Sequence, residues 1–166
     1  IALLLKIGGT SQISGRGYDV VVRRVSSLDE FKAALTSTAD IRAVYYFGHS
    51  GPSGLGVGNA VGANVYSKDL AGIDYSHLRR RATFVIFGCH AGQTTESGYP
   101  SFAYYLAYAS KRPVYAWKSG LNQRGNPSWT PFKALRGSRP PATGPLYWRS
   151  EDGSSAAKFD PWGDGR

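Results

Sequence analysis

The sequence predicts an α/β protein built on a mostly parallel sheet with helices packed against it. Short apolar runs rich in β-branched and aromatic residues recur along the chain and stop at glycine, which is typical of strands buried on both faces. Segments with helical periodicity alternate with these runs, as parallel strands require. The length of 166 residues suits one domain with a sizeable core.

The N-terminal region supplies two predicted strands and a helix. Ile1–Ile7 and Tyr18–Val25 have the apolar content of strands. Ser27 is placed to cap a helix, because Glu30 follows three residues later, as in a capping box. Leu28, the first of several apolar residues at helical spacing, follows the cap directly. This helix leads the chain across to the next strand.

Two later strands each end at a side chain suited to catalysis. The apolar run Ala43–Phe47 is followed by glycine and His49, and Ala82–Gly92 contains a similar run that stops at glycine and Cys89, the only cysteine. If the two strands are parallel neighbours, with Ser67–Leu78 in the crossover, His49 and Cys89 emerge at the same edge. Open α/β sheets carry their sites at that edge. A thiol beside an imidazole is an activated nucleophile.

The connecting segments are predicted from composition and periodicity. Glycine-rich Pro52–Asn64 indicates a flexible surface, and Val65–Leu70 opens a short helix. After the cysteine, Gln93–Pro100 is predicted to be a loop, Ser101–Ser110 a helix and Pro113–Trp117 a strand. Residues 1–118 therefore form the predicted core of sheet and helices.

The C-terminal part, residues 119–166, is predicted to be irregular within the same single domain. Proline, glycine, tryptophan and polar residues dominate it, and no long periodic segment appears. Trp129, Trp148 and Trp162 argue against a wholly disordered tail, because large aromatic side chains usually pack. We expect this part to wrap the sheet or to form one wall of a substrate cleft.

The pattern of strand, Gly, His49, Ser50, Gly51 and then strand, Gly88, Cys89 resembles the caspase-like cysteine peptidases. Within that group it is most similar to the bacterial, clostripain-, separase- and CHAT-type members. The histidine precedes the cysteine, whereas papain-like enzymes have the cysteine first. The resemblance covers about two-thirds of the chain. It implies a three-layer fold with helices flanking a mostly parallel sheet.

The resemblance also implies an activity and the residues that perform it. The expected function is that of a cysteine endopeptidase, with Cys89 as nucleophile and His49 as base and acid, and with no cofactor or metal. The oxyanion donors would be the backbone N–H groups of Cys89 and of position 50. Position 50 is Ser50 rather than glycine, although Gly51 offers backbone freedom one residue later. His90 would point to the opposite side if the backbone stayed extended, so we interpret it as a packing or loop residue.

The first specificity pocket implied by the resemblance is lined from the strand after the second predicted helix. Its candidates are Ala116, Trp117 and Lys118. Lys118, together with a net charge of +9, favours acidic or neutral protein substrates. The same charge makes an acidic inhibitor or immunity protein a plausible partner. Nucleic acid is not expected, because the basic residues are scattered and no nucleic-acid-binding signature accompanies them.

The composition bears on the setting of the protein. No apolar run approaches the roughly 20 residues of a membrane helix, so no membrane partner is expected. The chain begins at Ile1 and has no methionine, from which we expect a piece of a longer polypeptide. A bacterial toxin or effector domain, secreted or delivered into a target cell, fits these features.

Several alternatives stay open beside the peptidase hypothesis. The fold could serve as a catalytically inactive interaction module, or as a basic toxin domain that targets nucleic acid. A metal site of His49, His77, Cys89 and His90 lacks the usual ligand spacing. The glycines of residues 54–58 lack the lysine of a phosphate-binding loop.

Overall fold

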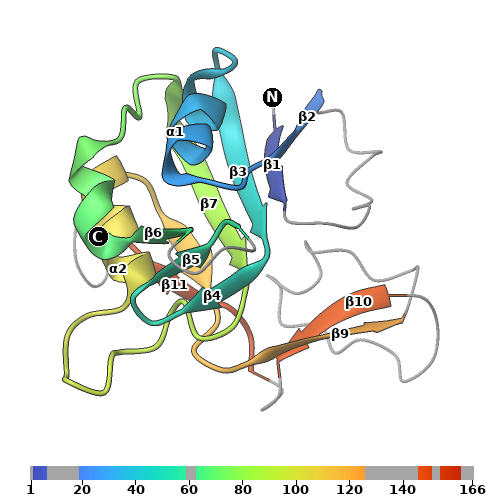
Figure 1. The fold of residues 1–166 in the computed structure, drawn as a ribbon, viewed down its shortest axis with the longest axis vertical. Coiled ribbons are helices and arrows are strands. Elements are labelled where there is room, and N and C mark those ends of the chain that lie inside the picture. The colour runs from blue at the N-terminus through green and yellow to red at the C-terminus, as the bar shows by residue number, and fades with distance from the viewer. Residues whose placement is uncertain (1, 7–18, 59–62, 126–145, 151–153, 162–166) are drawn as a thin grey trace.

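In the described part of the chain, the main sheet has six strands, of which one runs antiparallel to its neighbour. The computed structural model describes residues 2–6, 19–58, 63–125, 146–150 and 154–161. The strand order is β11-β8-β7-β3-β1-β2, with β11 antiparallel to β8 (Figure 1). The strands are β1 (Ala2–Lys6), β2 (Val20–Arg24), β3 (Ile41–Phe47), β7 (Leu78–Phe87), β8 (Val114–Ala116) and β11 (Ala157–Phe159). The predicted α/β class with a mostly parallel sheet is confirmed.

The central strands β3 and β7 are buried on both faces, as their apolar runs predict. Successive side chains alternate between two hydrophobic clusters, because side chains of a strand point to opposite faces. On the face that carries Phe47 and Phe87, these two rings stack with centroids 4.7 Å apart. Trp117 packs against Phe87 at 5.1 Å. This aromatic cluster lies next to the carboxyl ends of both strands.

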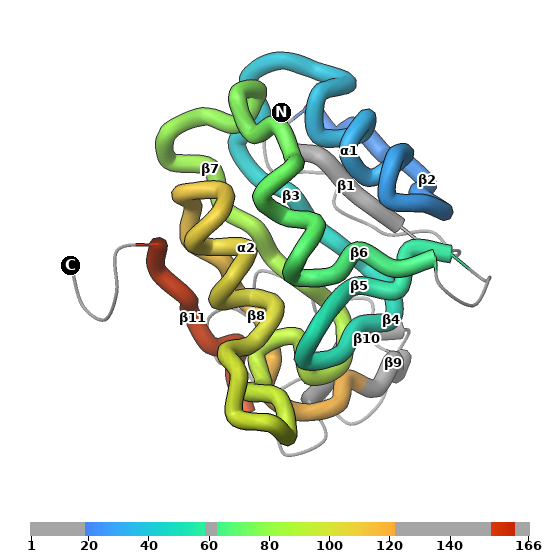
Figure 2. Tube along the Cα trace, turned by 60° about the vertical axis from the view of Figure 1, so that its left-hand side comes forward, coloured from blue at the N-terminus to red at the C-terminus, as the bar shows by residue number. Residues whose placement is uncertain are grey.

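The described helices cover the other face of the sheet (Figure 2). They are α1 (Leu28–Thr36), the 3₁₀-helix η1 (Ser67–Gly72) and α2 (Phe102–Ser110). Their buried side chains belong to the same cluster as Val44 and Ile86. Within the described residues, the aromatic cluster contains no helical residue, so a second helical layer is not part of what the structure describes. None of the described helices has the length and apolarity to cross a membrane.

The N-terminus of α1 is capped as the sequence predicts, with one shift in position. The Ser27 hydroxyl accepts a hydrogen bond from the Glu30 N–H at 3.2 Å. The Glu30 carboxylate accepts from the hydroxyl and N–H of Ser26, at 2.6 and 2.7 Å, so the reciprocal bond falls one residue earlier than in a standard capping box. These two hydrogen bonds lower the pKa of the Glu30 carboxyl below its ordinary value, and the bond from the Ser26 hydroxyl contributes more than the bond from the N–H.

The segment between the two central strands forms a small antiparallel sheet, not the flexible surface predicted from its glycines. Its strands are β4 (His49–Gly51), β5 (Gly54–Gly56) and β6 (Asn64–Tyr66). At Gly54 an added Cβ would lie 2.6 Å from the carbonyl oxygen of Val65, so close strand pairing requires glycine there. The helix predicted from Val65 begins instead at Ser67, because the preceding residues pair in β6. Residues 59–62 lie outside the described residues.

Among the described residues of the C-terminal part there are three strands, which the prediction of an irregular segment over 119–166 did not include. The strands β9 (Leu121–Gly125) and β10 (Leu146–Ser150) form an antiparallel pair, and β11 extends the main sheet beside β8. Trp148 lies in β10, whereas Trp129 and Trp162 fall outside the described residues. These short strands depend on partners distant in sequence, so local periodicity does not reveal them.

The pairing of β3 with β7 is regular at the carboxyl end and irregular at the other end. From Ala43 to Phe47 the partners run in register from Thr83 to Phe87, but Ile41 pairs with Leu78. A single residue of β3 therefore lies opposite residues 79–82, as in an extended bulge. The irregularity lies at the end of the strands that is remote from His49 and Cys89.

Candidate active site

The carboxyl ends of β3 and β7 bring His49 and Cys89 to the same edge of the sheet. The two strands are adjacent and parallel, and their register pairs Phe47 with Phe87. His49 and Cys89 each follow this pair by two residues, so the two strand ends stop at the same level. The predicted juxtaposition of the two segments, with the crossover between them, is confirmed.

Two hydrogen bonds join the strand ends. The Gly48 N–H donates to the Phe87 carbonyl at 3.2 Å, and the Ser50 hydroxyl donates to the Cys89 carbonyl at 2.7 Å. An added Cβ at Gly88 would contact the Ser50 hydroxyl and would lie 2.8 Å from the Gly48 carbonyl oxygen. The absence of a side chain at position 88 therefore permits this close approach.

His49 is exposed and begins the small strand β4. Tyr46 contacts the backbone of His49. Its hydroxyl lies 2.9 Å from the His49 carbonyl oxygen and 2.7 Å from the Gly56 carbonyl oxygen. Burial raises the pKa of Tyr46, so the hydroxyl stays protonated at neutral pH and donates to one of these acceptors. Tyr46 thus fixes the backbone from which the imidazole projects, while the ring of His49 remains accessible.

Cys89 is half-buried and packs against the aromatic cluster. The Leu121 N–H donates to its sulfur at 3.2 Å, and the thiol donates to the Leu121 carbonyl oxygen at 3.6 Å. The bond from the amide suits a thiol or a thiolate, whereas the bond to the carbonyl needs the neutral thiol, so nucleophilic attack by the thiolate requires that second bond to be given up. Leu121 is the first residue of β9, so the C-terminal part contributes directly to the surroundings of the thiol.

His90 does not continue the extended backbone, so the condition under which it would point to the opposite side is not met. Its φ is 58°, in the left-handed region, and the chain turns at this point. The His90 N–H donates to the Ser119 carbonyl at 3.0 Å, and its Nδ1 lies 3.3 Å from the Lys118 carbonyl. These contacts agree with the interpretation of His90 as a loop residue.

The three candidates for the specificity pocket differ in accessibility. The side chains of Ala116 and Trp117 are buried, with 0% and 2% of their surface exposed, whereas Lys118 is exposed. The Trp117 carbonyl accepts a hydrogen bond from the Gly92 N–H at 2.9 Å, which ties this segment to the turn after Cys89. Contact of these side chains with a substrate stays a prediction.

The backbone groups predicted to bind an oxyanion lie at the same edge. Ser50 and Gly51 belong to β4, where Ser50 pairs with Leu55 and Gly51 with Gly54. Cys89 follows the end of β7, and within the described part of the chain its N–H has no hydrogen-bond partner. A free N–H on the nucleophilic residue is the donor that an oxyanion site needs.

The residues of the alternative metal site are not brought together. Ile41 N–H donates to the His77 carbonyl at 2.9 Å, which places His77 just before the first residue of β7. Cys89 follows the opposite end of this ten-residue strand, about 30 Å away at the usual rise per residue. Among the described residues, no group of three or more His, Cys, Asp or Glu side chains is arranged to hold a metal ion.

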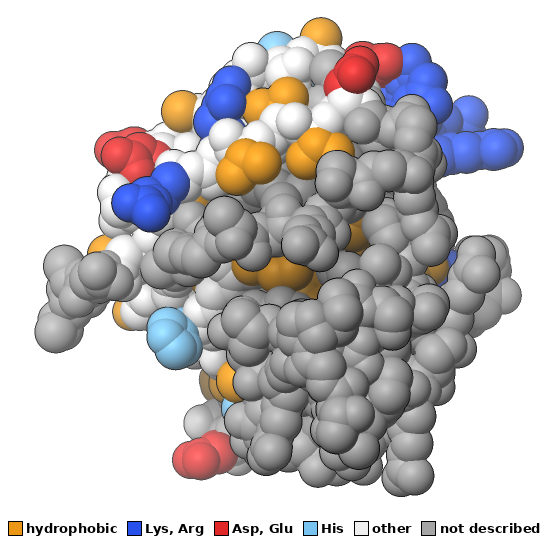
Figure 3. All heavy atoms as spheres, turned by 90° about the vertical axis from the view of Figure 1, so that its right-hand side faces the viewer, with side chains coloured by type: hydrophobic (Ala, Val, Ile, Leu, Met, Phe, Trp, Pro, Cys, Tyr) orange, Lys and Arg blue, Asp and Glu red, His pale blue; other side chains and the backbone are white. Residues whose placement is uncertain are grey.

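Among the side chains that Figure 3 draws in colour, basic ones gather at the upper right edge next to acidic ones, and a histidine side chain is exposed lower on the same face. Arg79 forms an exposed ion pair with Asp40, and the guanidinium lowers the pKa of that carboxyl. Part of the positive charge is therefore neutralised locally.

Comparisons with protein-family models, with curated proteins and with solved structures find no match to this chain.

Sequence reasoning missed two residues that shape the site and one role of a third. Ser50 was predicted to contribute its backbone N–H, but the hydrogen bond by which its hydroxyl connects the two strand ends was not predicted. The role of Tyr46 could have been predicted, because a tyrosine hydroxyl at a core position of a strand requires a hydrogen-bond partner. Leu121 carries no such signal, since its contact with the sulfur uses backbone atoms.

Proposed function

We propose that this chain is a cysteine endopeptidase with a caspase-like fold, in which Cys89 is the nucleophile and His49 the proton carrier. One observation supports the proposal most. The adjacent parallel strands β3 and β7 end in register, so the only thiol of the sequence and an accessible imidazole follow them at one edge of the sheet. A helix and a further parallel strand follow the cysteine, as the resemblance implies.

The proposed reaction proceeds through a thioester. The Cys89 thiolate attacks the carbonyl carbon of the scissile peptide, and the negative charge that develops on the oxygen is received by backbone N–H groups. The C–N bond then breaks, and protonated His49 gives its proton to the leaving amine. A water molecule then attacks the thioester while His49 accepts a proton from it; the C–S bond breaks, the carboxylic acid product leaves, and the Cys89 thiolate and protonated His49 are regenerated.

Several contacts prepare the chain for this chemistry. The Ser50 bond to the Cys89 carbonyl fixes the peptide that follows the nucleophile, and the N–H of Cys89, which has no hydrogen-bond partner among the described residues, would supply one oxyanion donor. Ser50 or Gly51 would supply the second donor. Tyr46 holds the backbone of His49. Preorganisation of this kind reduces the reorganisation needed when charge develops.

Substrate preference in this proposal follows accessibility. Because Ala116 and Trp117 are buried, Lys118 is the member of the predicted pocket whose side chain is available to a substrate. An exposed ammonium group favours acidic over basic residues in the cleaved protein. Replacement Lys118→Glu should therefore shift the preference away from acidic sites.

The proposal is tested by comparing new protein N-termini in a cell lysate treated with the wild-type chain, with Cys89→Ala and with His49→Ala, under reducing conditions. We expect sharp cleavages with the wild type alone. His90→Asn is the matched control, since asparagine tolerates the left-handed backbone of this neighbouring histidine. It should preserve cleavage.

Identical N-termini in the wild-type and Cys89→Ala samples, with no self-cleavage, would contradict the proposal. An interaction module or a domain that targets nucleic acid would then be the better explanation. In either case Cys89→Ala would leave binding unchanged.

A further inference from the structure

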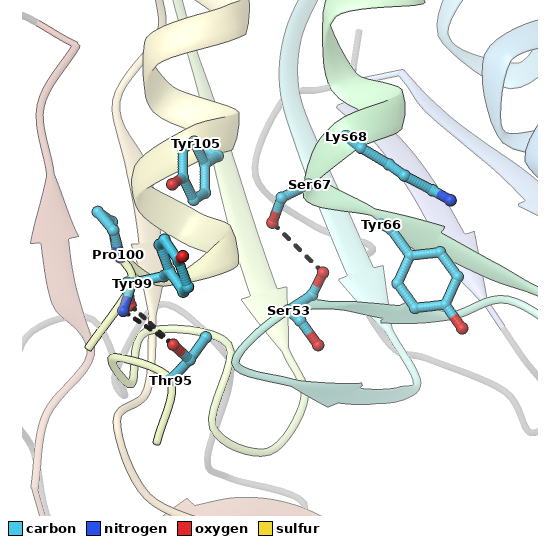
Figure 4. A pocket seen from close by; sticks show the side chains of 8 residues that line it. All are labelled: Ser53, Tyr66, Ser67, Lys68, Thr95, Tyr99, Pro100 and Tyr105. Carbon is cyan, nitrogen blue, oxygen red and sulfur yellow. Dashed lines mark hydrogen bonds between the residues drawn. The ribbon is translucent and has the colours of Figure 1, made fainter. Parts of the chain in front are cut away.

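A pocket lies between η1, α2 and the loop before α2 (Figure 4). Its volume is about 600 Å³, within the range of roughly 300–1,000 Å³ that is usual for small-molecule sites. It contains neither His49 nor Cys89, and it lies on the helical side of the sheet, whereas Cys89 packs with the aromatic cluster. The peptidase proposal leaves this pocket without a role.

One end of the pocket is aromatic and accessible. Tyr99, Pro100 and Tyr105 lie together on the α2 side in Figure 4. Tyr99 has 65% of its surface exposed, although a tyrosine of this size usually packs against a neighbour. Rings that line a concave surface in this way offer stacking area to a planar ligand.

The opposite end carries Lys68, the single charged side chain among the described residues that line the pocket. Lys68 and Tyr66 lie there, with the ammonium nitrogen 5.7 Å from the centre of the tyrosine ring. No carboxylate is among the residues that line the pocket in the described part of the chain. The neighbouring Asp69 is directed to the Tyr66 N–H at 2.8 Å. A ligand in this pocket therefore meets a cation without a competing anion.

Hydrogen bonds hold the walls in place. The Ser67 N–H donates to the Ser53 carbonyl at 3.1 Å, which joins the η1 side to the turn between β4 and β5. On the α2 side, the Tyr99 N–H donates to the Thr95 hydroxyl at 2.9 Å. A site whose walls are already fixed loses little conformational freedom when a ligand binds.

We propose that this pocket binds a small aromatic carboxylate. Its rings would lie against Tyr99, Pro100 and Tyr105, and its carboxylate would face Lys68. In Figure 4, Ser53 and Ser67 lie between the aromatic end and the end that carries Lys68. This order matches an elongated ligand with one apolar and one anionic end. This inference is independent of the peptidase proposal.

The test uses three probes of the same shape and different charge: biphenyl-4-carboxylate, biphenyl-4-methanol and biphenyl-4-methylamine. Titration calorimetry with the whole chain should give saturable binding of the carboxylate, with Kd on the order of 0.1–1 mM for a ligand of this size. The alcohol should bind about tenfold more weakly, because it lacks the charge-assisted contact with Lys68. The amine should bind more weakly still.

Variants locate the binding site. Lys68→Gln should reduce carboxylate affinity about tenfold, to the level of the alcohol, and Lys68→Arg should retain it. Tyr99→Ala should weaken binding of the carboxylate and of the alcohol. Lys111 and Tyr108 form a matched control, because this lysine also lies over a tyrosine ring, at 3.9 Å, but outside the pocket. Lys111→Gln and Tyr108→Ala should leave the affinities for the carboxylate and for the alcohol unchanged.

Absence of saturable binding, equal affinity for the three probes, or equal losses in the pocket variants and their controls would overturn the proposal. The same titration with Cys89→Ala should match the wild type. Failure of the peptidase proposal and failure of this one are thus observed separately.

Discussion

Substitution of Gly88 by alanine tests whether the two strand ends are as close as the structure describes. The new methyl group would contact the Ser50 hydroxyl, and it would lie 2.9 Å from the Ser50 Cβ and 2.8 Å from the Gly48 carbonyl oxygen. The hydroxyl can rotate away only by giving up its bond to the Cys89 carbonyl. The carbonyl oxygen of Gly48 belongs to the backbone, so the segment that carries His49 must shift.

The expected loss combines two effects. Overpacking of a well-filled site costs about 1–3 kcal/mol, and a lost hydrogen bond costs about 0.5–1.5 kcal/mol. We therefore expect Gly88→Ala to lower the free energy of unfolding by about 2–4 kcal/mol. For a chain of this length, that corresponds to a decrease in Tm of roughly 5–15 °C. Urea unfolding followed by tryptophan fluorescence measures the change.

Gly72→Ala provides the control, since an added Cβ at Gly72 has no neighbour within 4 Å. It should leave stability within about 0.5 kcal/mol of the wild type. In the double variant Gly88→Ala with Ser50→Gly, the two contacts with the serine side chain disappear and the contact with the Gly48 carbonyl oxygen remains. This variant should therefore be more stable than Gly88→Ala alone. The reasoning is refuted if Gly88→Ala unfolds like Gly72→Ala, or if the double variant recovers nothing.

Three further substitutions address single contacts. Ser50→Ala removes the bond to the neighbouring strand end and should lower the free energy of unfolding by about 0.5–1.5 kcal/mol; a wild-type value in urea unfolding would argue against that bond. Tyr46→Phe should cost a similar amount and reduce cleavage by the proposed peptidase, whereas unchanged stability and activity would mean that the hydroxyl does not hold His49. Glu30 gains stability from Ser26 only when ionised, because its pKa is lowered in the folded state. The Tm advantage of the wild type over Glu30→Gln should therefore be full above pH 4.5 and shrink as the pH falls through the lower folded pKa, and a constant difference would contradict this.

The sequence allowed the core of the fold to be predicted because its signals are local. Continuous apolar runs identify β3 and β7, and the serine cap identifies α1. The position of His49 and Cys89 at one edge follows from two such runs and the rules of parallel pairing. These inferences needed no information about distant contacts.

The parts that were not predicted depend on contacts between distant residues. The glycines of β5 suggested mobility, but Gly54 is required by the nearby backbone of Val65. The strand β11 spans three residues and exists through its pairing with β8. The hydrogen bond between Ser50 and the Cys89 carbonyl joins residues 39 positions apart, so no local pattern indicates it.

The irregular pairing at the start of β7 makes the two ends of this strand respond differently to a change in length. An extra residue inserted among residues 79–82 would enter a stretch that already lies opposite a single residue of β3, so the register beyond Thr83 would survive. An extra residue between Phe84 and Phe87 would shift Cys89 by one position along the strand, so that it no longer lies in register with His49. It would also turn the Cys89 side chain to the other face of the sheet. The first half of β7 should therefore tolerate an inserted residue, whereas near its carboxyl end the number of residues is fixed by the position that Cys89 must take.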